Sequence, residues 1–146
     1  MPEEIVLVPI GVVRAPYRTR DEAPDQGFLV EGESTIEVFP EYERGLVGIE
    51  PGIFLDVVYW MDRADRGNLW NVRKGRGIFS TRGPDRPNPL GICSVEVISV
   101  DGRRIRVKYL DALDGSLVVD LKHSFFRSAE ELRGRMRKRG DGEDGL

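Results

Sequence analysis

The sequence predicts a mainly β protein, a single domain whose strands curve into a closed, barrel-like sheet that is followed by a short C-terminal helix. Several short segments alternate apolar and polar residues with a period of two, as strands with one buried face do. Seventeen glycines and nine prolines among 146 residues indicate frequent turns, which disfavours a helical bundle. A chain of this length supports one hydrophobic core, and closure of the sheet would cover the strand edges.

Three strands are predicted in the first half of the chain. Residues 5–13 are rich in Val and Ile and lack helical spacing, and residues 34–39 alternate apolar with polar side chains. Residues 53–60 form another apolar run, interrupted by Asp56, which is typical of a buried strand. Residues 40–45, with Pro at the start and Gly at the end, predict a short helical turn.

The second half contains the clearest local pattern, a hairpin. Residues 95–100 and 103–109 flank Asp101-Gly102, a pair suited to a tight turn. Residues 116–121, entered through Asp114-Gly115, predict the last strand. In the second hairpin segment basic residues alternate with apolar ones that we expect to share one face, namely Ile105, Val107 and Tyr109.

The chain changes character after residue 127. Ser128, with Glu131 three residues later, fits a capping box, and Gly140 is a suitable helix end. We therefore expect the barrel domain over residues 1–127, a basic helix over residues 128–140 and a disordered tail over residues 141–146.

Residues 61–89 are rich in charge, Gly and Pro. We interpret them as long functional loops around a short strand at residues 77–81, because loops of this length in a small domain are commonly binding or catalytic sites.

The composition excludes several classes of site. With one cysteine, Cys93, and one histidine, His123, the chain has neither a disulfide framework nor the ligands of an ordinary zinc site. Only a site with oxygen ligands could then hold a metal, and we expect none. The acidic N-terminus does not resemble a signal peptide and no apolar stretch has the length of a membrane helix, so we expect a cytoplasmic protein without a membrane partner. We interpret Cys93 as a small buried residue; the alternative is a nucleophile with His123 as its base.

The formal net charge of -3 gives no general reason to expect a nucleic-acid partner, which would need a local basic surface. Residues 63–86 provide one, since seven of them are Lys or Arg and only two are acidic. Trp70 in this segment could stack on a base beside phosphate contacts, and a solvated loop is the alternative. The basic residues singled out here are Arg73, Lys74, Arg76 and Arg86. A second basic cluster lies on the predicted helix: Arg133, Arg135, Arg137, Lys138 and Arg139.

The segment 77–91 differs from a plain basic loop. Three prolines fix its backbone, so Arg82 and Arg86 are held on a stiff loop and lose little entropy on binding. A guanidinium held in this way can make a bidentate contact with a carboxylate or a phosphate. The alternative is a rigid corner between two strands, with arginines that bind local carbonyl groups.

The same segment reads Gly-Ile-Phe-Ser-Thr-Arg-Gly-Pro-Asp-Arg-Pro-Asn-Pro-Leu-Gly, which resembles the signature G-V-F-A-T-R-S-P-x-R-P-N-P-I-G of the TsaA/TrmO family of S-adenosylmethionine-dependent tRNA methyltransferases. Residues 10–17 resemble the family's opening I-G-x-I-x-S-P-F/Y, and residues 23–26 resemble A-P-x-Q. Residues 109–116 resemble L-D-L-V-D-G-T, and residues 118–122 resemble V-x-D-I-K. Five motifs in the same order make the resemblance specific.

The resemblance implies a small β-barrel methyltransferase (TsaA- or YaeB-like) that uses S-adenosyl-L-methionine and works as a homodimer with cofactor sites near the subunit interface. Bacterial members of the family methylate N6 of N6-threonylcarbamoyladenosine next to the anticodon of a threonine tRNA. Arg86 and the basic loop would then hold tRNA phosphates. By motif match, the expected cofactor contacts are Pro24, Asp25, Gln26, Met61, Asp62, Arg82, Ile92, Asp114, Gly115, Ser116 and Leu117.

The chain departs from the family pattern at four places. Asp25 stands where many relatives have Arg, and Asp62 where many have His. Gly83 replaces Ser, and Lys122-His123 replaces Lys-Pro. These departures are consistent with an intact cofactor pocket and a changed substrate preference.

A methyl group on a sulfonium is already activated, so the enzyme mainly has to align donor and acceptor. The attacking amine can lose its proton late, and Asp114 or Asp111 is the carboxylate expected to assist. Aromatic faces attract a sulfonium, and the residues considered for this are Tyr59, Trp60 and Phe79, with core packing as the alternative for each.

Two other classes of function remain open from the sequence. In one, the barrel binds S-adenosylmethionine or a nucleotide without transferring anything. In the other, the domain binds a protein partner and no small ligand, which the stiff Arg-Pro-Asn loop disfavours.

Overall fold

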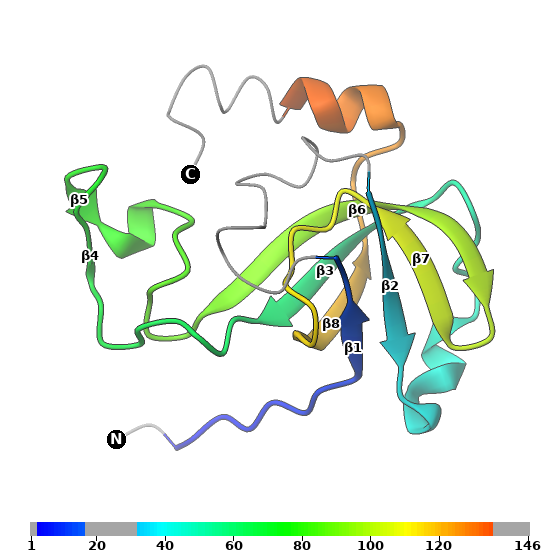
Figure 1. Ribbon diagram of the computed structural model, residues 1–146, viewed down its shortest axis with the longest axis horizontal. Coiled ribbons are helices and arrows are strands. Elements are labelled where there is room, and N and C mark those ends of the chain that lie inside the picture. Colours follow the sequence, from blue (N-terminus) through cyan, green and yellow to red (C-terminus); the bar gives the residue numbers. More distant parts are fainter. Residues whose placement is uncertain (1–2, 17–31, 136–146) are drawn as a thin grey trace.

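A computed structural model describes residues 3–16 and 32–135 (Figure 1). Six strands close into a barrel in the order β1-β2-β7-β6-β3-β8, and every neighbouring pair is antiparallel. A separate two-stranded sheet, β4-β5, projects to one side of the barrel. The elements are β1 (Gly11–Arg14), β2 (Glu33–Val38), the 3-10 helix η2 (Pro40–Leu46), β3 (Phe54–Trp60), β4 (Trp70–Asn71), β5 (Arg76–Gly77), the 3-10 helix η3 (Ile78–Ser80), β6 (Leu90–Asp101), β7 (Arg104–Lys108) and β8 (Leu117–His123).

The core fills the inside of the barrel with β-branched side chains. Alternate residues of each strand face inward, as the period-two pattern predicts, and the most deeply buried include Ile36, Val57, Val95, Ile105 and Val118. The strand β6 is long enough to pair with β3 over its first half and with β7 over its second half. Register shifts in the β6–β7 and β3–β8 pairs bend the strands, as bulges do where a sheet closes.

The predicted strands at residues 34–39, 53–60 and 116–121, the hairpin and the short helical turn are confirmed. The predicted turn pair Asp101-Gly102 is wrong by one residue, because Asp101 pairs with Arg104 and the turn residues are Gly102 and Arg103. The φ of Gly102 is 59°, a value suited to glycine at the first central position of a tight hairpin.

The prediction for residues 5–13 is wrong in its first part, because β1 begins only at Gly11. Ile5 and Val6 are 87% and 81% exposed and lie in an extended segment outside the barrel (Figure 1). The Val and Ile content that predicts a strand is present, but in the described part of the chain the first residue with backbone hydrogen bonds to the neighbouring strands is Ile10, next to the start of β1.

The predicted strand at residues 77–81 is also wrong, since η3 occupies most of it. The hydroxyl groups of Ser80 and Thr81 donate to the carbonyl oxygens of Gly77 and Ile78, each at 2.8 Å. These local hydrogen bonds stabilise a turn of helix in place of an extended segment.

The C-terminal helix begins at Ala129 and is helical to Arg135, the last described residue. Ser128 Oγ accepts a hydrogen bond from the Glu131 amide at 3.1 Å, which confirms the predicted N-terminal cap. The rest of the predicted helix, residues 136–140, and the predicted tail, residues 141–146, lie outside the described residues.

A second, smaller core lies between the barrel and this helix. Phe54 on the outer side of β3 packs with Tyr109 and with Leu132 of the helix. The alternation along β7 predicts Tyr109 beside Ile105 and Val107 in the barrel, and this is wrong. The φ of Tyr109 is 77°, the left-handed region, and the reversal turns its ring to the outer cluster while Leu110 enters the main core. Such a conformation costs a bulky residue about 1–3 kcal/mol.

We expect Gly91→Ala to destabilise the protein, because a Cβ there would lie 2.4–2.8 Å from three atoms of the Tyr59 ring. Overpacking of this kind costs about 1–3 kcal/mol, measurable as a lower midpoint of urea denaturation. Gly45→Ala is the control, because its Cβ would meet no atom within 4 Å. Equal midpoints for the two variants would contradict the close approach of the ring.

Candidate functional site

One end of the barrel gathers several of the predicted cofactor contacts. Trp60, the last residue of β3, pairs with Leu90 on one side and with Leu117 on the other. The next residue, Met61, donates its amide to the Pro89 carbonyl at 2.8 Å. Ile92 pairs with Val58 two residues before Trp60, and both Ile92 and Leu117 are exposed, at 53% and 41%. Met61, Ile92 and Leu117 therefore flank the same strand end and leave an apolar surface there.

Arg82 reaches this surface from the proline-rich loop. Its Nη2 donates to the carbonyl oxygen of Ile92 at 3.0 Å, which ties the guanidinium to β6 while the side chain remains exposed. Asp62, the other predicted contact beside Met61, is also exposed.

Arg86, the second arginine of the loop, binds the loop itself. Its Nε donates to Gly83 O at 2.7 Å, and its Nη2 donates to Ile78 O at 3.1 Å and to Thr81 O at 2.5 Å. Burial and the nearby charge of Arg82 lower the pKa of Arg86. This is the arrangement in which an arginine binds local carbonyl groups, and it fixes the loop that carries Arg82.

Asp111 lies among buried groups at the same end of the barrel. The Tyr59 hydroxyl donates to Asp111 Oδ1 at 2.7 Å, and the Cys93 thiol lies beside the carboxylate. Burial raises the pKa of Asp111 above its ordinary value, although the hydrogen bond from Tyr59, the adjacent Cys93 thiol and the charge of Arg82 act to lower it. A carboxyl group with a raised pKa is typical of acid–base sites.

Asp114, the other predicted carboxylate, holds a turn. Its Oδ1 accepts a hydrogen bond from the Ala15 amide at 3.1 Å. The Gly115 amide donates to Val13 O at 2.7 Å, and the Val13 amide donates to Ser116 O at 2.8 Å, so the turn is fastened to β1. The φ of Gly115 is 85°, which suits glycine at this position.

Cys93 and His123 are not arranged as a nucleophile and a base. Cys93 is buried in the main core, and its thiol donates to Tyr109 O at 3.0 Å. Burial is the main cause that raises the pKa of the thiol, and the charge of Asp111 adds to it, both of which disfavour a reactive thiolate. His123 is exposed at the far end of β8, where it pairs with Leu55.

The three aromatic residues considered for a cation differ in environment. Tyr59 is buried and packs in the core. The guanidinium of Arg66 lies 5.1 Å from the ring centre of Trp60, so this ring already faces a cation. Phe79 is 75% exposed on η3.

The hairpin β4–β5 carries three of the four predicted basic contacts away from the barrel (Figure 1). Arg73 and Arg76 are exposed, Lys74 is half-buried, and the Lys74 amide donates to Asn71 Oδ1 at 3.0 Å. Trp70, next to Asn71, is 55% exposed. An exposed indole beside basic side chains suits a nucleic-acid strand.

The base of this hairpin is joined to the proline-rich loop. Asp85 Oδ1 accepts from the Asp65 amide, and Asp85 O accepts from Asn68 Nδ2, each at 2.8 Å. Arg66 Nε donates to Pro87 O at 2.8 Å. The hairpin and the Arg82 loop are thus fastened to each other.

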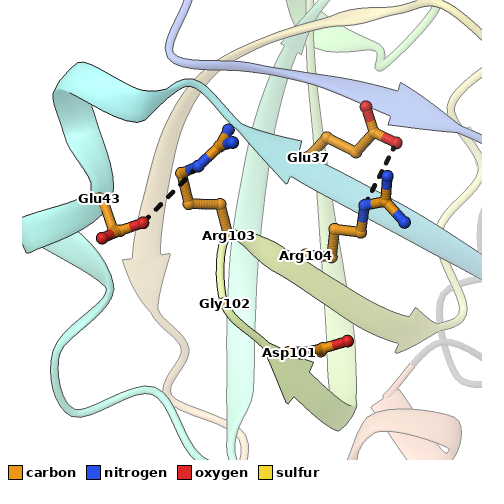
Figure 2. Close-up of a pocket in the computed structure, with 6 residues that line it drawn as sticks. All are labelled: Glu37, Glu43, Asp101, Gly102, Arg103 and Arg104. Carbon is orange, nitrogen blue, oxygen red and sulfur yellow. Dashed lines mark ion pairs between the residues drawn. The ribbon is translucent and has the colours of Figure 1, made fainter.

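A separate pocket of about 390 Å³ lies on β2, η2 and the β6–β7 turn (Figure 2). Its charges are largely paired: Arg103 Nε lies 3.6 Å from Glu43 Oε1, and Arg104 Nε lies 3.8 Å from Glu37 Oε1. None of the predicted site residues lines it. The other lining residues are Asp101 and Gly102.

Some predictions cannot be placed. Pro24, Asp25 and Gln26 lie outside the described residues.

Over residues 3–16 and 32–135, no group of three or more His, Cys, Asp or Glu side chains could hold a metal ion. No helix in this part of the chain is long and apolar enough to cross a membrane.

The sequence did not single out three tertiary features of the structure. The Tyr59–Asp111 hydrogen bond joins residues 52 positions apart, and nothing in the local pattern pairs them. The contact of Arg66 with Trp60 and that of Arg133 with Tyr109 are likewise tertiary. Polar residues within apolar runs, such as Cys93, are the only local signal of a buried polar cluster.

The comparisons with known proteins concern nearly the whole described chain. The family model for the tRNA-methyltransferase O N-terminal domain matches residues 12–129. A protein of Archaeoglobus fulgidus named S-adenosyl-L-methionine-binding protein is 48% identical over 122 residues, which are 81% of this chain and 88% of that protein. A protein of Methanothermobacter thermautotrophicus named probable S-adenosyl-L-methionine-binding protein is 49% identical over 123 residues, 82% of this chain and 89% of the other.

Solved structures give the same fold. The crystal structure of TrmO from Pseudomonas aeruginosa superposes with a TM-score of 0.71 and 25% identity over 84% of this chain, and a second TrmO crystal structure gives 0.72 and 26% over 85%. This chain covers 56% and 57% of the length of those two chains. The match confirms the predicted closed β barrel with its C-terminal helix.

We expect Asp111→Asn to change how stability depends on pH. Burial raises the pKa of Asp111 in the folded protein above 3.8, so protonation of this carboxyl favours folding. That stabilisation is present in full below the ordinary pKa and is lost as the pH rises through the folded pKa. The Asn variant retains an acceptor for Tyr59 without the charge, so its stability relative to the wild type should rise towards neutral pH.

Urea denaturation over a series of pH values measures this difference. Asp62→Asn is the control, because it makes the same replacement at an exposed aspartate. A pH profile of Asp111→Asn that runs parallel to that of the wild type would show that Asp111 is not titrating as a buried carboxyl.

Proposed function

The chain belongs to the family of the tRNA-methyltransferase O N-terminal domain, and on this premise we propose that it is an S-adenosylmethionine-dependent tRNA methyltransferase. The substrate we propose is N6 of N6-threonylcarbamoyladenosine next to the anticodon. The observation that carries the proposal is Arg82, which the stiff loop holds on β6 at the barrel end, near the partly buried carboxylate of Asp111. The archaeal relatives named as S-adenosyl-L-methionine-binding proteins support the choice of cofactor.

The residues at the barrel end fit this cofactor chemically. A guanidinium suits its carboxylate, and the exposed apolar side chains of Ile92 and Leu117 suit an adenine ring. When bound, S-adenosylmethionine would supply a methyl group on a sulfonium, which is activated for in-line displacement. The remaining predicted contacts, residues 24–26, Met61, Asp62 and 114–117, are part of the proposal.

The protein's part in the reaction is chiefly to align the two reactants, which can supply roughly 7–11 kcal/mol of the barrier. Arg82 binds a carboxylate and fixes the orientation of the donor. Asp111 accepts the proton that the acceptor nitrogen loses, for which its raised pKa is suited. Asp114 shapes the turn before β8 through its hydrogen bond to Ala15.

The basic hairpin β4–β5 is the proposed tRNA surface. Arg73, Lys74 and Arg76 contact phosphates, and Trp70 offers its exposed ring to a base. Arg86, with three hydrogen bonds to loop carbonyls, orders the loop in this scheme. A homodimer and a cytoplasmic location remain part of the same proposal.

The second candidate is a module that binds S-adenosylmethionine without transferring its methyl group, which the names of the archaeal relatives also suit. Incubation with tRNA and cofactor labelled in the methyl group separates the two. Label in N6-threonylcarbamoyladenosine supports the transferase. Binding without incorporation into tRNA supports the module.

We expect Arg82→Ala to weaken the binding of S-adenosylmethionine by about tenfold or more, since a charged hydrogen bond is worth about 1.5–3 kcal/mol. Isothermal titration calorimetry measures the change. Arg104→Ala is the matched control, because Arg104 is exposed on β7 and pairs with Glu37 away from this end of the barrel. Unchanged affinity in Arg82→Ala would remove Arg82 from the cofactor site.

We expect replacement of Arg73, Lys74 and Arg76 by alanine to weaken tRNA binding and to flatten its dependence on salt. Each lost phosphate contact lowers the slope of log K against log salt by about 0.7–0.9. Filter binding at several salt concentrations gives this slope. Arg44→Ala with Arg104→Ala is the control at the other side of the barrel, and an unchanged slope in the triple variant would exclude the hairpin as a tRNA surface.

A further inference from the structure

The segment that follows β7 reverses direction at Tyr109 and then delivers Asp111 to the end of the barrel. Tyr109 has a φ of 77° although it carries a bulky side chain. Leu110 and Ala112 enter the main core after the reversal, and Asp111 lies between them, at Tyr59 and Cys93. The position of Asp111 therefore depends on a backbone conformation that most residues avoid.

The C-terminal helix contacts the Tyr109 side chain at two residues. Arg133 Nη2 donates to the Tyr109 hydroxyl at 2.6 Å, and the Arg133 guanidinium lies 5.5 Å from the centre of the same ring. Leu132, which is fully buried, packs against Tyr109 and Phe54. On the other side, the Tyr109 carbonyl accepts a hydrogen bond from the Cys93 thiol at 3.0 Å. One residue thus links the helix outside the barrel to the polar cluster inside it.

We propose that Arg133 is a positioning residue: by holding the Tyr109 ring under the C-terminal helix, it maintains the left-handed turn that places the Asp111 carboxylate at the barrel end. The catalytic consequence rests on the proposed function, in which Asp111 accepts a proton. The effect of Arg133 on the position of the Asp111 carboxylate does not depend on that function.

Arg133 also belongs to the basic cluster of the helix, so a contact with RNA is the rival explanation for any loss of activity. A variant of Arg135 distinguishes the positioning role from a contact with RNA. Arg135 lies on the same helix, two residues further on, and is exposed. Arg135→Ala removes the same charge from the helix without touching Tyr109.

The experiment follows the titration of the Asp111 carboxyl by carbon-13 NMR in the full chain, together with kcat and KM for tRNA methylation. We expect Arg133→Ala to move the titration midpoint of Asp111 down towards that of an exposed aspartate and to lower kcat about tenfold, with KM for tRNA nearly unchanged. A misplacement of about 1 Å can cost as much as about 100-fold. Arg133→Lys keeps a cation over the ring and should retain most of kcat.

Two further results decide the matter. An Asp111 midpoint that Arg133→Ala leaves at the wild-type value overturns the proposal. So does an equal loss of kcat in Arg133→Ala and Arg135→Ala, because the helix would then act through its charge. If wild-type protein transfers no methyl group, the proposed function fails, and the titration still tests the placement of Asp111 by the helix. Thermal denaturation of each variant verifies that it folds.

Discussion

The arrangement of this end of the barrel depends on the burial of one carboxylate. Asp111 lies where burial raises its pKa, and a buried carboxyl is tolerated only when polar groups surround it. The Tyr59 hydroxyl, the Cys93 thiol and the charge of Arg82 fulfil this requirement from three different parts of the chain. Two of them are constrained in turn: Gly91 leaves room for the Tyr59 ring, and Ile92 holds Arg82 through its carbonyl.

The two arginines of the proline-rich loop have different roles: one fixes the loop and the other stays exposed. The sequence alone could not tell which arginine has which role. Arg86 turns inward to three carbonyl oxygens and makes the loop rigid, whereas Arg82 makes one backbone contact and stays exposed. A rigid loop loses little entropy when its exposed guanidinium binds an anion. The alternative considered for the loop was a rigid corner whose arginines bind local carbonyl groups, and Arg86 fits this description. Because Arg86 makes the loop rigid, Arg82 is held in place and remains exposed for binding an anion.

The strands could be predicted because each buries one face, so residues 34–39 and 53–60 show the periodicity of their environment. The position of Tyr109 could not be predicted in this way. A backbone reversal turns its ring to the outside of the barrel, where it packs against Leu132 of a helix more than 20 positions away. Residues 5–8 have the composition of a strand, but pairing is a tertiary property, and they lie exposed. For the site, the sequence predicts either Asp114 or Asp111 as the assisting carboxylate and does not decide between them. Their hydrogen bonds to Tyr59 and Ala15, 52 and 99 positions away, distinguish a carboxyl in the barrel end from one that holds a turn.

Hydrogen bonds between the basic hairpin and the Arg82 loop affect how tRNA and the methyl donor could be aligned. Asp85, Asn68 and Arg66 join the base of the hairpin to the loop through hydrogen bonds of 2.8 Å. If the hairpin holds tRNA and Arg82 holds the methyl donor, as proposed, both ligands are bound by one rigid unit rather than by two independent surfaces. Alignment is the main requirement of a transfer whose methyl group is already activated, and a shared rigid support meets that requirement before either ligand binds. The Pro-rich loop then has a mechanical function as well as a chemical one, because it sets the distance between the two binding surfaces.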